Sequence, residues 1–137
     1  MSFYSTYLTT IKKWLGRVTD FDGRYANQCV DWVKRYASEI GYPIETFGNA
    51  IELGIRWLWK RWYRVAMWQV GDIVVFPRGQ YWHIAVVARV DWNIVFVHEQ
   101  NRNGMANFKN NPKNLGSPIS LWKYTLTGKE IWFRARG

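Results

Sequence analysis

The order of sequence patterns predicts an α+β fold, with helices in the first part of the chain and an antiparallel sheet in the second. Residues 5–40 carry apolar positions at helical spacing, whereas residues 72–136 hold short β-branched and aromatic runs separated by turn residues. The chain has 137 residues, of which 48% are hydrophobic and 18% aromatic. This length and composition predict one folded domain over residues 1–137, with a core of its own.

Two amphipathic helices are predicted before the sheet. Across residues 5–15 the apolar positions recur three and four residues apart, and Gly16 ends the pattern. A second helix is predicted from about residue 27 to residue 40, where the sequence GYP stops it because Gly caps helix ends and Pro disfavours continuation. The only cysteine of the chain, Cys29, therefore lies in the first turn of the second helix.

The middle of the chain mixes tryptophan with Arg and Lys. We interpret residues 48–68, GNAIELGIRWLWKRWYRVAMW, as one or two helices. After Gly71 the sequence changes to short runs rich in Val, Ile and aromatic residues, which is typical of adjacent antiparallel strands. The predicted strands are DIVVF (72–76), WHIAVVARV (82–90), NIVFVHEQN (93–101), SLWKYTL (120–126) and EIWFRAR (130–136).

The charge of the chain is strongly positive, with 19 Lys and Arg against 10 Asp and Glu, a net charge of +9. Such a field attracts polyanions, so nucleic acid, anionic lipid and acidic cell-wall polymer all stay open as partners. The segment RWLWKRWYR (56–64) favours a glycan, wall-polymer or single-strand nucleic-acid surface, because tryptophan stacks on sugars and bases. A helix with buried tryptophan and a solvated basic face, or one lying in a membrane interface, accounts for the same residues equally well.

A single cysteine cannot close an intramolecular disulfide, so stability must come from the core. The first 16 residues, MSFYSTYLTTIKKWLG, lack the uninterrupted apolar run of a secretory signal or a membrane span. We therefore expect no signal peptide and no transmembrane segment, and we expect a monomer.

A thiol nucleophile needs a base, and the chain offers only His83 and His98, both in predicted strands. Strand alternation puts Glu99 and Asn101 on one face of residues 93–101 and His98 on the other. If His83 and Glu99 face the same helix, the thiol of Cys29 can meet an imidazole and a carboxylate. Such a set activates cysteine, because the thiolate attacks, the base stabilises it and a third group orients the imidazole. The helix start adds unpaired N–H groups that favour a negative sulfur.

The sequence around these residues resembles one family in several linked motifs. DFDGRYANQCVDWV, FGNA, VGDIVVF, HIAVV and VHEQN occur in the order and spacing of the CHAP family, the cysteine- and histidine-dependent amidohydrolases and peptidases. The resemblance covers residues 20–101 and implies a papain-like α+β fold and hydrolysis of amide bonds in bacterial peptidoglycan. It also implies that Cys29 is the nucleophile and His83 the base. Glu99 would then orient the imidazole, and Asn101 would be a supporting polar residue.

Two neighbours of these residues have expected roles in substrate binding. Gln28 precedes the nucleophile as in many family members, and the resemblance implies that it shapes the oxyanion site. Trp82 stands where many members have Gly before the base, which changes the expected shape of the pocket. Considered without the motifs, a lone cysteine is usually inert packing, and the motifs reverse that interpretation for Cys29. His98 has no counterpart in the family and is expected to be exposed or structurally bonded.

The loop before the second helix also has the spacing of a calcium site. Asp20, Asp22 and Asp31 stand at positions one, three and twelve of a loop that enters a helix, as in an EF-hand. The backbone carbonyls of Arg24 and Ala26 would fill positions five and seven. Some CHAP members resemble this pattern and bind calcium there, so a structural Ca²⁺ is expected, although the chemistry itself requires no cofactor.

These features together predict a peptidoglycan hydrolase that cleaves an amide bond, as an N-acetylmuramoyl-L-alanine amidase or a cell-wall endopeptidase. Its expected partners are peptidoglycan and anionic wall polymers, with nucleic acid disfavoured. It would reach the wall through a phage or another non-classical route. Two alternatives stay open: a papain-like thiol hydrolase that acts on other amides, and a basic, tryptophan-rich binding module with a degenerate catalytic scaffold.

Overall fold

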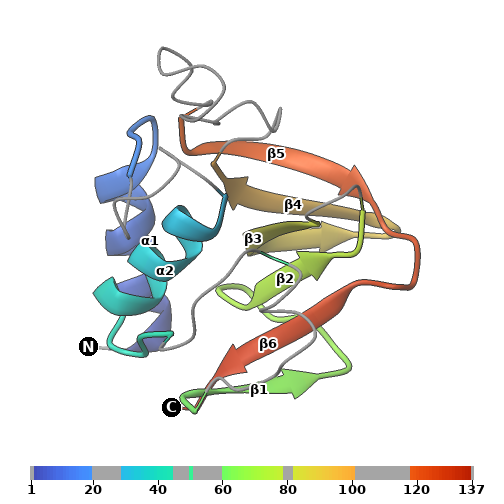
Figure 1. Ribbon diagram of the computed structural model, residues 1–137, viewed down its shortest axis with the longest axis horizontal. Coiled ribbons are helices and arrows are strands. Elements are labelled where there is room, and N and C mark those ends of the chain that lie inside the picture. The colour runs from blue at the N-terminus through green and yellow to red at the C-terminus, as the bar shows by residue number, and fades with distance from the viewer. Residues whose placement is uncertain are drawn as a thin grey trace.

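Two helices pack on one face of a six-stranded antiparallel sheet (Figure 1). The computed structural model describes residues 2–19, 29–44, 50, 60–78, 82–100 and 118–136. Within them the helices are α1 (Phe3–Trp14) and α2 (Cys29–Glu39). The strands are β1 (Trp62–Val65), β2 (Ile73–Phe76), β3 (His83–Asp91), β4 (Ile94–Glu99), β5 (Ser120–Thr125) and β6 (Ile131–Ala135). The expected α+β architecture, with N-terminal helices on a C-terminal sheet, is confirmed.

The strand order across the sheet is β1-β6-β2-β3-β4-β5. The four strands from β2 to β5 follow one another as neighbours, although only the connections from β2 to β3 and from β3 to β4 are short and residues 100–119 lie between β4 and β5. The last strand, β6, instead lies between β1 and β2, so the C-terminal segment closes the sheet against two strands from the middle of the chain.

The prediction of one or two helices across residues 48–68 is wrong at its C-terminal end. We expected helix across residues 48–68, but Trp62–Val65 forms strand β1, which pairs with β6 from Trp62 opposite Ala135 to Val65 opposite Trp132. Trp62 is buried and Tyr63 is exposed, as the alternation of a strand requires. The prediction failed because the strand is short and its pairing partner lies about seventy residues later in the chain. Residues 51–59 lie outside the described residues.

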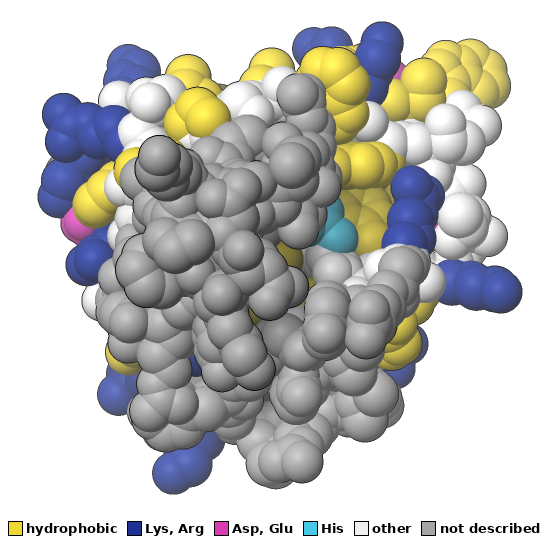
Figure 2. Space-filling view, turned by 45° about the horizontal axis from the view of Figure 1, so that its top comes forward, with side chains coloured by type: hydrophobic (Ala, Val, Ile, Leu, Met, Phe, Trp, Pro, Cys, Tyr) yellow, Lys and Arg dark blue, Asp and Glu magenta, His cyan; other side chains and the backbone are white. Residues whose placement is uncertain are grey.

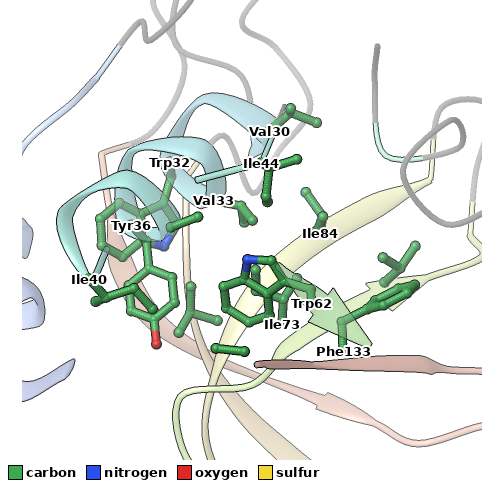
Figure 3. Close-up of a cluster of buried hydrophobic side chains, with 14 of the residues drawn as sticks. Val30, Trp32, Val33, Tyr36, Ile40, Ile44, Trp62, Ile73, Ile84 and Phe133 are labelled. Carbon is green, nitrogen blue, oxygen red and sulfur yellow. The ribbon is translucent and has the colours of Figure 1, made fainter. Parts of the chain in front are cut away.

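The main core fills the space between α2 and the sheet (Figure 3). Helix α2 contributes an apolar stripe, and the strands contribute the side chains that project toward it. The labelled members are Val30, Trp32, Val33, Tyr36, Ile40, Ile44, Trp62, Ile73, Ile84 and Phe133. Two hydrogen bonds fix the helix further: the indole Nε1 of Trp32 donates to the carbonyl of His98 at 2.9 Å, and the hydroxyl of Tyr36 donates to the carbonyl of Gly71 at 2.7 Å.

The VGD sequence before β2 has a structural role. Gly71 has a φ of 87°, and a Cβ atom there would lie 2.7 Å from the ring of Phe3, so both its backbone and its surroundings favour glycine. Asp72 is buried and accepts hydrogen bonds from the backbone N–H of Gln69 at 2.7 Å and from Nε of Arg134 at 3.0 Å. This carboxylate therefore ties the start of β2 to β6.

The opposite face of the sheet carries a second apolar cluster. Its members alternate with the helix-facing residues along β2, β3 and β4: Val74, Phe76, Ala85, Val87, Val95 and Val97. Tyr124 of β5 packs against this cluster from the edge of the sheet. No helix in the described part of the chain is long and apolar enough to cross a membrane.

Candidate active site

Three side chains that the sequence predicts to be functional meet at one end of the sheet. Cys29 is the first residue of α2, His83 the first of β3 and Glu99 the last of β4. Nε2 of His83 lies 2.5 Å from Oε2 of Glu99, and the thiol of Cys29 is near enough to the same imidazole to raise its pKa. Because Nε2 is engaged by the carboxylate, Nδ1 is the ring nitrogen left for the thiol.

The two strand residues share a face of the sheet, as alternation predicts, but it is not the face that the helices cover. His83 and Glu99 project on the side of Ala85 and Val97, whereas Ile84 belongs to the helix-side core. Contact with Cys29 is possible because each residue stands at the end of its element, where the thiol can reach the imidazole past the end of the strand.

The carboxylate of Glu99 is fully buried, with no surface accessible to solvent. The hydroxyl of Tyr124, from β5, lies 2.7 Å from Oε2 and 2.9 Å from Oε1 of Glu99. The rings of Phe76 and Tyr124 also flank His83, with centroids 6.1 and 5.9 Å from the imidazole. The sequence analysis missed Tyr124 because it lies beyond the recognisable motifs, in a strand whose pairing with β4 is set by the fold.

The electrostatics of the site favour a charged imidazole. Burial lowers the pKa of His83, but hydrogen bonds to Cys29 and Glu99 and the negative charges of both groups outweigh burial and raise the pKa to about 10. At neutral pH the ring is therefore an imidazolium between a sulfur and a carboxylate. The first turn of α2 adds backbone N–H groups and the positive end of the helix dipole beside Cys29.

This arrangement of a helix-start cysteine, a strand histidine and a buried carboxylate agrees with a comparison against family sequence models. The model of the CHAP domain matches residues 19–101, more than half of the chain. The protein belongs to the CHAP family.

Solved structures support the same fold. The structure titled as a wild-type endolysin, LysIME-EF1, superposes with a TM-score of 0.74 at 20% identity, covering 98% of this chain and 64% of that one. Ly7917 superposes with a TM-score of 0.65 at 15% identity, covering 98% of this chain and 63% of that one. A structure of Ly7917 with the hydrolysing product of MDP gives 0.65 at 16% identity, covering 100% and 64%. This chain thus spans less than two thirds of these relatives, and no curated protein sequence matches it.

The backbone explains why many CHAP sequences have Gly immediately before the base. Trp82 has a φ of 59°, the left-handed region that glycine enters freely and that costs other residues about 1 to 2 kcal/mol. Tryptophan at this position therefore carries backbone strain that glycine would avoid. The indole is half-buried against the helix-side core, which Cys29 also contacts. Because strain of this kind gathers at functional sites, Trp82 stays a candidate substrate contact.

A side-chain clamp anchors the chain before the segment that leads to Cys29. The amide of Gln100 accepts a hydrogen bond from the backbone N–H of Thr19 at 2.7 Å and donates one to the carbonyl of Thr19 at 2.8 Å. Nε of Arg35 donates to the Thr19 hydroxyl at 3.1 Å. Since Gln100 follows Glu99 directly, the same stretch of chain holds both the carboxylate and this anchor. The sequence analysis missed its role, although Gln100 lies inside the VHEQN motif.

The second histidine is not part of the site. His98 is buried against Tyr7 of α1, with ring centroids 6.4 Å apart, and burial lowers the pKa of its imidazole to about 4. Its Nδ1 has no hydrogen-bond partner among the described residues. The side chain is therefore not exposed, which was one of the two expected states, because Tyr7 covers this position from the helix side of the sheet.

Several predicted site residues lie outside the described residues. They are Gln28 and Asn101 near the nucleophile and carboxylate, and Asp20, Asp22, Arg24 and Ala26 of the expected calcium loop. Asp31, the last predicted ligand, is buried in the first turn of α2. A carboxylate there fits the oxygen chemistry that Ca²⁺ prefers, but the described residues hold no cluster of three or more acidic, Cys or His side chains that could bind a metal, at Asp31 or at any other position.

Proposed function

We propose that this chain is a cysteine-dependent peptidoglycan hydrolase that cleaves an amide bond of the bacterial wall. The observation that carries the proposal is the placement of the helix-start residue Cys29 near an imidazole that a buried carboxylate holds at 2.5 Å. Membership of the CHAP family and the endolysin title of a structural neighbour support the wall as the location of the substrate. The bond cleaved is either the one between muramic acid and L-alanine or one within the peptide.

The reaction follows from the charges in the site. The Cys29 thiolate attacks the amide carbonyl carbon, and the carbonyl electrons move onto oxygen to form a tetrahedral intermediate. As the intermediate collapses, the C–N bond breaks and the imidazolium of His83 gives its proton to the leaving amine, leaving a thioester on Cys29. The neutral imidazole then takes a proton from water, the resulting hydroxide attacks the thioester, and the thiolate leaves with the imidazolium restored.

The other residues of the site act through position and charge. Glu99 keeps the imidazole in one orientation and stabilises its positive charge through Nε2. Backbone N–H groups at the start of α2, with Gln28 beside them, bind the oxygen of the tetrahedral intermediate. Asn101 is a supporting polar residue near the Glu99 carboxylate, and Trp82 contacts the substrate.

The net charge of +9 suggests how a chain of this size stays on its substrate. Anionic wall polymers would hold it through long-range attraction, which added salt screens. Binding to purified walls should therefore weaken as salt rises at fixed protein concentration. Binding that does not depend on salt would reject this electrostatic attachment.

The catalytic proposal is tested with purified peptidoglycan. Wild-type protein should release new amino groups from it, and mass spectrometry of the released muropeptides identifies the bond. The Cys29→Ala variant should lose this activity while it still binds the walls. An unchanged rate in that variant would reject the nucleophile, and inertness of the wild type toward walls would favour other amides as substrates.

We further propose that Ca²⁺ binds where Asp31 enters α2 and supports the start of the helix. Ligand binding to the folded state raises the melting temperature, so Ca²⁺ should raise it and a chelator should lower it. Mg²⁺ serves as the control ion, since it demands a smaller and more regular shell of ligands. The same melting temperature with Ca²⁺ and with chelator would reject the site.

A further inference from the structure

A positively charged side chain beside the site has no role in the mechanism above. The guanidinium of Arg78, two residues after β2, lies over the rings of Phe76 and Tyr124, at 5.5 and 5.6 Å from their centroids. These are the same two rings that flank the imidazole of His83. Arg78 and His83 therefore contact the same two aromatic rings.

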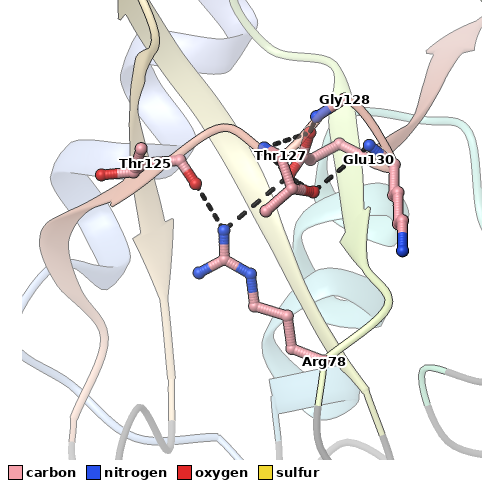
Figure 4. A network of polar contacts seen from close by, with 6 residues as sticks. Arg78, Thr125, Thr127, Gly128 and Glu130 are labelled. Atoms are coloured by element: carbon pink, nitrogen blue, oxygen red, sulfur yellow. Dashed lines mark hydrogen bonds and ion pairs between the residues drawn. The ribbon is translucent and has the colours of Figure 1, made fainter.

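The guanidinium is held in place from the turn between β5 and β6 (Figure 4). Nη2 of Arg78 donates to the backbone carbonyl of Thr125 at 2.5 Å and lies 3.8 Å from a carboxylate oxygen of Glu130. Glu130 is itself buried and accepts hydrogen bonds from Thr127 and from the N–H of Gly128. Burial raises the pKa of Glu130, but those bonds outweigh it and leave the pKa below its usual value, so the carboxylate stays charged.

Within the part of the chain that the structure describes, Arg78 uses little of its hydrogen-bonding capacity. A guanidinium has five N–H donors, and among the described residues the carbonyl of Thr125 is the only acceptor that it contacts within hydrogen-bonding distance. The side chain is 39% exposed. Figure 2 shows a histidine in a hollow of this face, with hydrophobic side chains and a Lys or Arg side chain at its border. The guanidinium of Arg78, held in one orientation at the edge of the site, is therefore available to a ligand.

We propose that Arg78 forms a subsite for a free carboxylate of the peptide substrate. The planar fork of Arg matches a carboxylate with two parallel hydrogen bonds, which a Lys ammonium cannot reproduce. Wall peptides carry free carboxylates at their C-terminus and on acidic residues, and some of these groups occur in amidated form. The subsite would therefore bind peptides in which this carboxylate is free more tightly than peptides in which it is amidated. This inference rests on the proposed hydrolase function.

The test compares two soluble muropeptides that differ only in whether one carboxylate is free or amidated. Wild-type enzyme should have a KM about tenfold lower for the free acid, and Arg78→Gln should remove that preference with little change in kcat. Arg78→Lys should restore only part of it, because the ammonium keeps the charge without the fork. Soluble muropeptides contain no polymer phosphate, so a preference seen with them is not due to phosphate on the wall.

Arg89→Gln is the matched control. Arg89 also lies over an aromatic ring, 4.2 Å from the centroid of Phe96, and also pairs with an acid, Asp91 at 3.3 Å, but it stands six residues farther along β3 than His83. This variant should keep the preference of the wild type. A KM that rises equally for both muropeptides in Arg78→Gln, or does not rise at all, would overturn the subsite.

Binding measurements separate this inference from the hydrolase proposal. In the Cys29→Ala background, calorimetry should show a dissociation constant about tenfold lower for the free acid, and Arg78→Gln should abolish the difference. If the wild type cleaves neither muropeptide but this binding preference is present, the hydrolase proposal fails and the subsite stands. If both muropeptides are cleaved and bound alike, only the subsite fails.

Discussion

The hydroxyl of Tyr124 lies 2.7 and 2.9 Å from the two carboxylate oxygens of Glu99, and the carboxylate in turn lies 2.5 Å from Nε2 of His83. Strand β5, which lies beyond the family motifs, thus supplies a hydrogen bond to the carboxylate that holds the imidazole. Because Glu99 is fully buried, no solvent can replace a lost partner without rearrangement.

We predict that Tyr124→Phe impairs positioning without removing any reacting group. The change deletes the hydroxyl and keeps the ring, so the buried carboxylate loses a hydrogen bond worth about 1 to 3 kcal/mol. We expect kcat on peptidoglycan to fall about tenfold while KM changes little. Tyr4→Phe, which alters an exposed ring on α1, is the control and should leave kcat unchanged. Equal rates for Tyr124→Phe and wild type would show that the hydroxyl does not position Glu99.

The pH dependence of the rate should depend on Glu99. The pKa of His83 is about 10, and the mechanism needs its protonated form, so kcat/KM should fall as pH rises through about 10. Glu99→Gln removes the negative charge that helps to raise this pKa. The alkaline limb of the profile should therefore move to lower pH, with a reduced maximum. An alkaline limb at the same pH in both proteins would assign it to another group.

The left-handed backbone of Trp82 predicts an inverted order of stability. Trp82→Gly and Trp82→Ala both lose the packing of the indole, but only Ala retains the cost of a φ of 59°. The Gly variant should therefore be more stable than the Ala variant by about 1 kcal/mol in chemical unfolding. At Lys123, an exposed position within β5, Gly should instead be the less stable of the two. If Trp82→Ala were instead more stable than Trp82→Gly, the backbone at this position would have left the left-handed region once the indole was removed.

Gly71 and Gly41 separate the effect of backbone conformation from that of crowding. Their φ values are 87° and 91°. A Cβ added at Gly71 would lie 2.7 Å from the ring of Phe3 and 3.1 Å from the Tyr36 hydroxyl, whereas a Cβ added at Gly41 would meet nothing within 4 Å. Gly41→Ala should cost about 1 to 2 kcal/mol of unfolding free energy. Gly71→Ala should cost about 1 to 3 kcal/mol more because of overpacking. Equal losses would show that Phe3 moves aside freely.

Local sequence determined much of this fold. The helical spacing of residues 5–15 and 27–40 and the β-branched runs after Gly71 predicted both helices and five of the strands, because side-chain periodicity depends only on nearby residues. Alternation also placed His83 and Glu99 on one face of the sheet. The motifs around Cys29 identified the family, since their order and spacing are properties of the sequence itself.

Tertiary structure decided what depends on distant pairing. The local pattern of Trp62–Val65 fits a helix, and only its pairing with β6 makes it a strand. Tyr124 reaches Glu99 because β5 pairs with β4, and Arg78 reaches the ring of Tyr124 only in the folded sheet. The sequence thus determined which residues are candidates for the reacting groups. The fold decided which residues surround them, because hydrogen bonds between strands join segments whose separation along the chain leaves no local periodic signal.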